Sequence, residues 1–249
     1  MISRAAPQGP RRSRSRLAWT LMALASTVGV ILFCGLGIWQ VQRLAWKTDL
    51  IARVEARLAA PAVPAPAEAD WPGIASGPDE YRRVEVTGQF DFSRDRLVQA
   101  VTQQGPGFWV MTPLQTDQGW AVWINRGFVP QDRREAADRI QPSGDQAVSG
   151  LLRITQPDGA FLRSNDPAAG RWYSRDVEAL SADAGLATHA PYFIDADPGQ
   201  DPQALPVGGL TVVSFRNSHL SYALTWFAMA AGLALGAFYV LRADRRLGD

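Results

Sequence analysis

The stretch NSHLSYALTWFAMAAGLALGAFYV, at positions 217–240, decides the fold of this chain. From Leu220 to Leu241 it contains no charged residue. An α-helix rises ~1.5 Å per residue, so about 20 apolar residues cross ~30 Å of hydrocarbon. The stretch therefore predicts a transmembrane helix over residues 217–241, with one titratable and metal-competent side chain, His219, at its edge.

A second uncharged apolar run covers residues 17–38. It is longer than the ~7–15 residue apolar core of a cleaved signal peptide, and no small-x-small cleavage site follows it. Cys34 is the only cysteine and follows Phe33, where a lipoprotein signal needs a small residue. We therefore predict a first transmembrane helix over residues 17–38. Apolar residues at helical spacing predict that it continues as a helical extension over residues 39–60.

The charges of the chain are distributed unevenly. The first 16 residues carry five arginines and no acid, whereas residues 43–215 carry 16 basic and 22 acidic residues, a net charge of −6. Three more arginines follow the second apolar run. Basic residues beside membrane spans stay in the cytoplasm, so this pattern predicts a topology rather than nucleic-acid binding. We expect basic cytoplasmic tails at residues 1–16 and 242–249, and an acidic region outside.

The region between the two apolar runs changes to a period of two, which is typical of strands. Residues 61–79 are rich in proline and predict a semi-rigid linker, followed by one β-rich α+β domain over residues 80–215. Turns are predicted at residues 104–107 and 125–127, and a helix over residues 174–186 with Ser174 as its N-cap. The predicted strands cover residues 83–90, 96–101, 108–114, 120–125, 146–154, 191–195 and 210–215. The fold class is thus a membrane protein in which two transmembrane α-helices flank a β-rich extracytoplasmic domain.

Small residues recur at a spacing of four in both apolar runs. Ala228, Gly232 and Gly236 form such a row in the second run, and Ala25 and Gly29 in the first. Rows of this kind let two membrane helices approach closely, although the spacing also arises by chance. We expect the two helices of the chain to pack together.

Seven segments carry a resemblance to a known family. In chain order they are GLGIWQVQRLAWK (35–47), YRRVEVTGQF (81–90), GPGFWVMTPL (105–114), VWINRGFVP (122–130), RWYSRDVEAL (171–180), PYFIDAD (191–197) and NSHLSYALTWFAMA (217–230). Their order between two apolar helices resembles the Surfeit-locus-1 family of cytochrome oxidase assembly factors. The resemblance covers nearly the whole chain outside the N-terminal tail and residues 59–79. Ser218 and Phe128 depart from residues common in the family, and neither change removes a candidate ligand.

The resemblance implies a function and its partners. Such proteins assist the assembly of haem-copper terminal oxidases, and bacterial members bind haem a. It therefore implies a non-enzymatic assembly factor that binds haem a transiently, with the oxidase catalytic subunit, haem a synthase and membrane lipid as partners and no nucleic acid. Because the basic tail is shorter than a mitochondrial presequence, we expect a bacterial inner (plasma) membrane location, multi-pass, with both termini cytoplasmic and the central domain periplasmic.

The family's second-helix histidine is implicated in haem binding and matches His219. Haem iron takes a neutral imidazole nitrogen, and a free imidazole is mostly neutral at pH 7. On a helix, Tyr222, Ala223 and Trp226 share the face of His219 at i+3, i+4 and i+7. Ala223 leaves room, and Trp226 is placed to stack on a ring. Without the resemblance, His219 reads more simply as an interfacial residue bonded to a lipid headgroup.

Trp39, Gln40 and Arg43 leave the first helix at a similar depth and complete the predicted cofactor-binding set. If the helices pack together, Arg43 can pair with a haem propionate as a forked donor. The alternative is that Trp39 and Arg43 only anchor the helix at the interface. Arg126, in a predicted turn, either contacts a partner or stabilises that turn, and we favour the turn.

Three functions compete at this point. The first is the haem-binding assembly factor, with His219 as ligand to the haem iron. The second is a cofactor-free membrane scaffold that stabilises oxidase subunits during assembly. The third, a membrane-tethered hydrolase, is disfavoured because the central region has no G-x-S-x-G or H-E-x-x-H motif and only one histidine, His189. We predict no catalytic residues, and the choice between a cytochrome c oxidase and a quinol oxidase as client stays open.

Overall fold

The computed structural model describes residues 16–74, 78–157, 163–201, 203–211, 215 and 217–248. The chain divides into two compact units. One is formed by Met1–Ala52 together with Phe215–Asp249, and the other by Arg53–Ser214. We refer to the first as the helix pair and to the second as the β domain.

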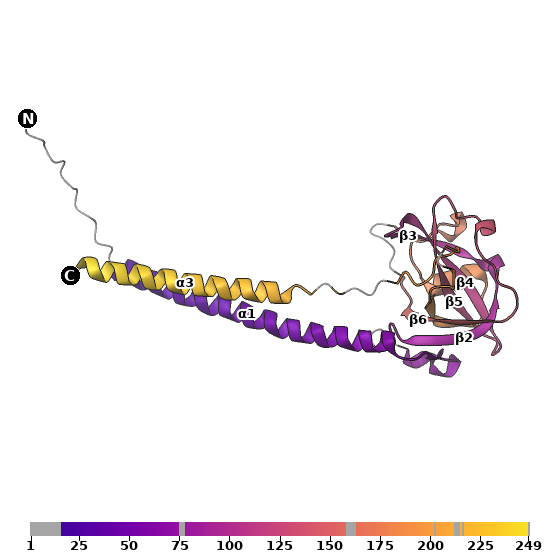
Figure 1. The fold of residues 1–249 in the computed structure, drawn as a ribbon, viewed down its shortest axis with the longest axis horizontal. Helices are drawn as coiled ribbons and strands as arrows, with labels where there is room; N and C mark the ends of the chain where they lie inside the picture. Colours follow the sequence, from indigo (N-terminus) through magenta and orange to yellow (C-terminus); the bar gives the residue numbers. More distant parts are fainter. Residues whose placement is uncertain are drawn as a thin grey trace, which may run out of the picture. The chain divides into compact units, whose positions relative to one another are not determined.

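The helix pair consists of α3 (His219–Gly248) and of α1 (Arg16–Ala59) as far as Ala52, and the two helices lie side by side in Figure 1. Neither helix contains a proline, and α1 ends just before Pro61, which cannot continue a helix. Both contain a span long and apolar enough to cross a membrane, Leu17–Ala59 and His219–Ala243. Their large apolar side chains are mostly exposed, as lipid-facing helices require. The chain is therefore a two-span membrane protein.

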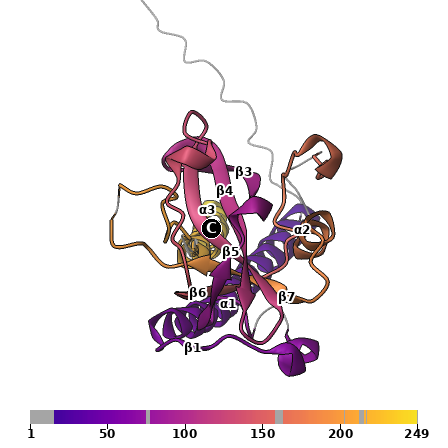
Figure 2. The ribbon, with the colours of Figure 1, turned by 90° about the vertical axis from the view of Figure 1, so that its right-hand side faces the viewer.

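The β domain is built on a seven-stranded sheet within the described residues. Its strands are β1 (Val63–Pro64), β2 (Arg83–Phe90), β3 (Arg96–Thr102), β4 (Gly105–Thr116), β5 (Ala121–Pro130), β6 (Gln146–Ile154) and β7 (His189–Ala196). One helix, α2 (Val177–Ala184), lies against β7 (Figure 2). Short 3₁₀ turns cover Glu68–Gly73, Phe92–Arg94, Ala136–Asp138 and Pro167–Ala169.

The sheet closes on itself. Its order is β1-β2-β6-β7-β5-β4-β3, and β2 also pairs with β4, so that β2, β6, β7, β5 and β4 form a ring. The pairs β5–β7 and β1–β2 are parallel, and the others are antiparallel. Closure gives both sides of the five ring strands a partner strand, which removes the open edges that promote aggregation.

Both faces of the central strands are buried. Along β7, Tyr192 and Ile194 belong to one hydrophobic cluster, while Phe193 between them belongs to another that includes Leu180 of α2. In β5, Ile124 belongs to the first of these clusters and Trp123 to the second. Successive strand residues point to opposite faces, so a strand buried on both faces reads as a continuous apolar run. This explains why these segments lack the polar alternation of β2.

Several strand predictions are confirmed, and some boundaries are wrong. The predicted strands 83–90 and 146–154 coincide with β2 and β6, and those at 96–101 and 191–195 lie within β3 and β7. The predicted turn at 104–107 mostly belongs to β4. The last predicted strand, 210–215, lies largely outside the described residues, and Leu210 and Thr211 have no strand assignment.

The turn predicted at residues 125–127 is wrong because β5 continues through it to Pro130. Gly127 has φ 130°, which a side chain would rarely allow, and a Cβ there would lie 2.2 Å from the carbonyl oxygen of Val207. Phe128 next to it pairs with Val207 in an antiparallel bridge. A segment far along the chain therefore keeps this strand extended.

Two further local predictions differ from the structure. The helix predicted from Ser174 begins at Val177, because Asp176 is the N-cap and its side chain accepts from the backbone of Glu178 and Ala179. The proline-rich segment predicted as a linker packs on the sheet: it contains β1, and Trp71 makes an edge-to-face contact with Trp120 at 5.8 Å between ring centroids.

Candidate functional site

The two long helices pack antiparallel through one face of each. Moving outward along α1, Gly29 meets Leu233, Phe33 meets Trp226 and Gly37 meets Phe227, and finally Gln40 meets His219. As the residue numbers on α1 increase, those of the contacting residues on α3 decrease, except that the adjacent Trp226 and Phe227 are exchanged. This order shows that the two helices are antiparallel. The predicted packing of the two helices is therefore present, and it brings together residues separated by about 180 positions in the chain.

Glycine on α1 makes this approach possible. A Cβ built at Gly29 would lie 2.6 Å from Leu233, and one at Gly37 would lie 2.6 Å from the Phe227 ring. Small residues let membrane helices come close enough for such contacts. On α3, the buried small residues are Ala223 and Ala230. The packing face of α3 is thus the face of His219.

The predicted row of small residues on α3 does not take part. Ala228, Gly232 and Gly236 are exposed, and a Cβ at either glycine would meet nothing within 4 Å. Ala25 on α1 is exposed as well, whereas Gly29 is a contact. A spacing of four is typical of helix packing, but the prediction from it was wrong for α3, which packs through the face of Ala223 and Ala230.

The central contact of the site joins His219 to Gln40. The Nδ1 atom of His219 lies 2.7 Å from Oε1 of Gln40, within the range of a good hydrogen bond. Gln40 is buried, with 9% of its surface exposed, and His219 is half-buried at the start of α3. An amide oxygen can only accept, so this contact is a hydrogen bond in the neutral tautomer that carries its proton on Nδ1, and in that tautomer Nε2 keeps its lone pair.

The Nε2 atom is the chemically available group of this site. Among the residues that the structure describes, no hydrogen bond reaches Nε2 of His219. A neutral imidazole nitrogen with a free lone pair is a metal ligand, and its geometry is fixed when the other nitrogen donates to a neighbour.

Trp226 lies two helical turns from His219, as predicted. It stacks on Phe33 of α1 with ring centroids 5.7 Å apart and an interplanar angle of 29°. Ala223, between them, is buried in the packing face rather than lining open space, so the room it leaves is used by the helix contact. Phe33 was missed from the sequence, although Phe33, Gly37 and Gln40 have the same four-and-three spacing as His219, Ala223 and Trp226.

The other predicted site residues lie on the surface of the helix pair. Trp39 is 53% exposed and Tyr222 is 56% exposed. Arg43 is exposed one turn beyond Gln40, and its guanidinium carbon lies 4.0 Å from the centroid of the Trp46 ring. This cation–π contact holds Arg43 along α1. The structure thus joins His219 to Gln40 directly and leaves Trp39, Tyr222 and Arg43 as exposed neighbours in sequence.

The donor set of the site suits a haem better than a bare metal ion. No group of three or more His, Cys, Asp or Glu side chains able to hold a metal ion occurs within the described ranges. A bare zinc or iron ion needs several protein ligands, whereas a porphyrin supplies four nitrogens and needs only an axial ligand from the protein. A single imidazole at the end of an apolar helix meets that need.

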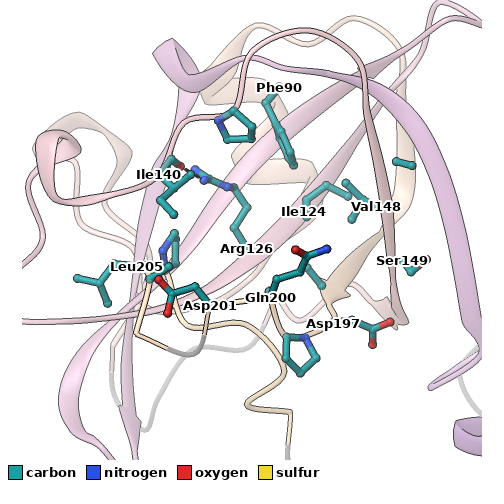
Figure 3. Close-up of a pocket in the computed structure, with 17 residues that line it drawn as sticks. Phe90, Ile124, Arg126, Ile140, Val148, Ser149, Asp197, Gln200, Asp201 and Leu205 are labelled. Atoms are coloured by element: carbon teal, nitrogen blue, oxygen red, sulfur yellow. Dashed lines mark hydrogen bonds between the residues drawn. The ribbon is translucent and has the colours of Figure 1, made fainter.

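The β domain contains a pocket of about 560 Å³ (Figure 3). Arg126 forms part of its wall, donates to the carbonyl oxygen of Ile140, and lies over the rings of Phe90 and Phe92. Burial lowers the pKa of Arg126 to about 10. The guanidinium thus contacts its own domain, but Arg126 lies within β5, so the prediction that it stabilises a turn is wrong.

The acids near that pocket have partners as well. Asp197 pairs with Arg83, and Asp201 accepts from the backbone of Gln203. The domain's histidine, His189, begins β7 and is half-buried. The pocket has no histidine or cysteine among its lining residues, so it offers no nucleophile–base pair of the kind that hydrolases use.

Comparison with known proteins is consistent across the chain. Residues 27–231 match the model of the SURF1 family. The chain is 35% identical over 235 residues to Surfeit locus protein 1 of Mus musculus, covering 87% of this chain and 73% of the mouse protein. The human Surfeit locus protein 1 is also 35% identical, over 236 residues that cover 87% of this chain and 75% of the human protein. A SURF1-like protein of Monosiga brevicollis is 33% identical over 93% of this chain and 90% of its own length.

Proposed function

This chain belongs to the SURF1 family, and on that premise we propose that it is a non-enzymatic assembly factor for a haem-copper terminal oxidase. In this proposal Nε2 of His219 would hold the iron of haem a at the helix pair, and the protein would assist insertion of the haem into the oxidase catalytic subunit. The observation that carries the proposal is the hydrogen bond between His219 and Gln40 at the edge of an apolar helix, with no described residue bonded to Nε2.

The surroundings of His219 support an amphipathic ligand. Leu220 and Tyr222 on α3 and Trp39 on α1 are large, exposed apolar or aromatic side chains next to the His219–Gln40 pair in sequence. Haem a combines a flat apolar macrocycle and a long apolar tail with charged propionates. When bound, the haem would supply the iron that Nε2 of His219 ligates and the visible absorption bands by which binding can be detected. Arg43 is exposed at the next turn of α1 and would supply a cation for a propionate if its side chain left the Trp46 ring.

The proposed partners follow from this role. A carrier of haem a receives it from haem a synthase and delivers it to the oxidase catalytic subunit, both in the same membrane. The proposed location is a bacterial plasma membrane. The arginines of the first 16 residues and those at positions 242, 245 and 246 support cytoplasmic termini, and the acidic central region supports a periplasmic β domain.

The test compares substitutions of the two histidines of the chain, with His189 as the control for His219. The full-length protein is purified in detergent from cells that make haem a, and its visible spectrum is recorded for the wild type, His219→Ala and His189→Ala. We expect wild type and His189→Ala to carry haem a in equal amounts. His219→Ala should lose the haem bands because the ligand is gone.

A colourless wild-type protein from haem-replete cells would contradict haem binding and favour the cofactor-free scaffold. A His219→Ala variant that keeps its full haem content would contradict the assignment of the ligand. In a deletion strain, oxidase polypeptides that persist without activity would support the haem role, whereas their disappearance would support the scaffold.

A further inference from the structure

Gln40 is an unusual residue for its place in the molecule. Among the described residues of the helix pair it is the polar side chain that is buried, with 9% of its surface exposed, and it lies three residues before Arg43, the first charge after the apolar run of α1. A buried amide that lacks a hydrogen bond costs about 1–3 kcal/mol. The carbonyl oxygen of the Gln40 side chain avoids that cost through Nδ1 of His219 at 2.7 Å.

The neighbours of Gln40 hold this geometry in place. Gly37, one turn earlier on α1, lets Phe227 approach so closely that a Cβ would lie 2.6 Å from the ring. Ala223, one turn after His219, is buried. Small residues one turn from each partner therefore bring the two backbones together at the depth where the amide and the imidazole meet.

From these contacts we infer that Gln40 is a positioning residue that sets the tautomer of His219. Its carbonyl oxygen keeps the proton on Nδ1, fixes the ring plane, and presents the lone pair of Nε2 as the ligating atom. That Nε2 then binds haem iron rests on the proposed function, whereas the choice of tautomer does not. In metal sites such second partners orient the imidazole and raise its basicity, and their loss costs about 10–100-fold in affinity.

The chain offers a matched set of variants. Gln40→Leu removes the acceptor and keeps an apolar side chain of similar size. Gln40→Glu keeps an oxygen acceptor at the same position and strengthens it. Gln42 lies two residues away on α1 and is exposed, so Gln42→Leu is the control for replacing a glutamine by leucine on this helix.

The first measurement needs no haem. Haem-free, full-length protein is labelled with ¹⁵N-histidine in lipid nanodiscs, and the ring-nitrogen shifts of His219 are recorded at about pH 8.5, where a free imidazole is neutral. The His189→Ala variant assigns the two rings. We expect a protonated, pyrrole-type Nδ1 and an unprotonated, pyridine-type Nε2 in wild type, Gln40→Glu and Gln42→Leu. In Gln40→Leu the two shifts should move toward the averaged values of an unrestrained ring.

Either of two results would overturn the inference. One is a proton on Nε2 in the wild type, which would mean that Gln40 donates its amide to Nδ1. The other is a pattern in Gln40→Leu that equals the wild-type pattern. If the tautomer is as expected but no haem binds, the proposed function fails and the positioning role stands.

The second measurement uses the haem-loaded protein. We expect Gln40→Leu to bind haem about 10-fold or more weakly, and Gln42→Leu to bind as the wild type does. Gln40→Glu should keep its haem and lower the midpoint potential, because a carboxylate makes the imidazole a stronger donor to ferric iron. Equal potentials in wild type and Gln40→Glu would contradict a link between Gln40 and the ligand.

Discussion

The helix pair and the β domain differ in how many hydrogen bonds their buried polar side chains make. In the β domain, Asp195 is 4% exposed and accepts hydrogen bonds from four side chains, those of Asn125, Arg153, Arg175 and Thr211, at 2.6–3.1 Å. In the helix pair, Gln40 makes one bond to His219. The first arrangement uses all the capacity of its central carboxylate, whereas the second leaves a ring nitrogen without a bond among the described residues.

This difference separates a structural network from a site. A buried carboxylate whose lone pairs are all used stabilises the fold and has nothing left for a ligand. An imidazole that is oriented by one nitrogen and open at the other is prepared for a ligand. The chemistry of this protein is therefore expected in the helix pair, and the Asp195 network is expected to stabilise the β domain.

The largest expected effect comes from breaking the β-domain network. Asp195→Ala leaves Arg153 and Arg175 without their shared carboxylate, and removing one member of a buried ion pair costs about 3–5 kcal/mol. Hydrogen exchange of β5 and β7 amides in the full-length protein in nanodiscs measures the loss. Asp132→Ala, at an exposed position, is the control and should change stability by less than about 0.5 kcal/mol.

The helix pair should not respond to that substitution. The ring-nitrogen pattern of His219 is expected to be the same in Asp195→Ala as in the wild type, because the two belong to separate compact units. If Asp195→Ala changed the ring-nitrogen shifts of His219 as well as the hydrogen exchange of the strands, the two regions would not be independent.

A smaller effect is expected from crowding the helix contact. Gly37→Ala places a methyl group 2.6 Å from the Phe227 ring, and overpacking of this kind costs about 1–3 kcal/mol. Part of that cost should appear as weaker haem binding, about 5-fold to 10-fold, because the helices separate where Gln40 meets His219. Gly35→Ala is the matched control: its Cβ meets nothing within 4 Å, and its affinity should equal that of the wild type. Equal haem affinities for the two variants, measured by haem titration, would show that close packing at Gly37 does not support the site.

The smallest effect concerns the pH dependence of the β domain. Burial raises the pKa of Asp95 above its ordinary value, and this outweighs the hydrogen bond from Thr112 and the nearby charge of Arg139. The folded state then binds this proton more tightly than the unfolded state. The wild type should therefore gain stability relative to Asp95→Asn as the pH falls through the raised pKa. The denaturant midpoints of the two proteins, compared at pH 7 and pH 4, measure this change. A difference that moves the opposite way on acidification would contradict the raised pKa.

The sequence predicted those features that depend on local pattern. Strands β2 and β6 alternate between apolar and polar residues, so their bounds followed from the period of two. The spans followed from the absence of charge, and the placement of His219, Ala223 and Trp226 on one face followed from helical spacing. Each of these depends on residues a few positions apart.

What the sequence could not predict depends on distant contacts. The extension of β5 through Gly127 requires the backbone of Val207, and the hydrogen bond of Gln40 requires a histidine 179 positions away. Gln40 was predicted to lie near the site, but no local pattern could indicate that it would orient the ring. The face of α3 that packs was also undetermined, because both Ala223–Ala230 and Ala228–Gly236 present small residues at helical spacing.

The central claim is that one imidazole nitrogen, Nε2 of His219, ligates haem iron. Pulsed electron paramagnetic resonance of the ferric haem in the His189→Ala protein, labelled with ¹⁵N only at histidine, tests it directly because His219 is then the one histidine left in the chain. We predict a strong hyperfine coupling from one coordinated ¹⁵N. Bound haem that shows no such coupling would contradict the claim.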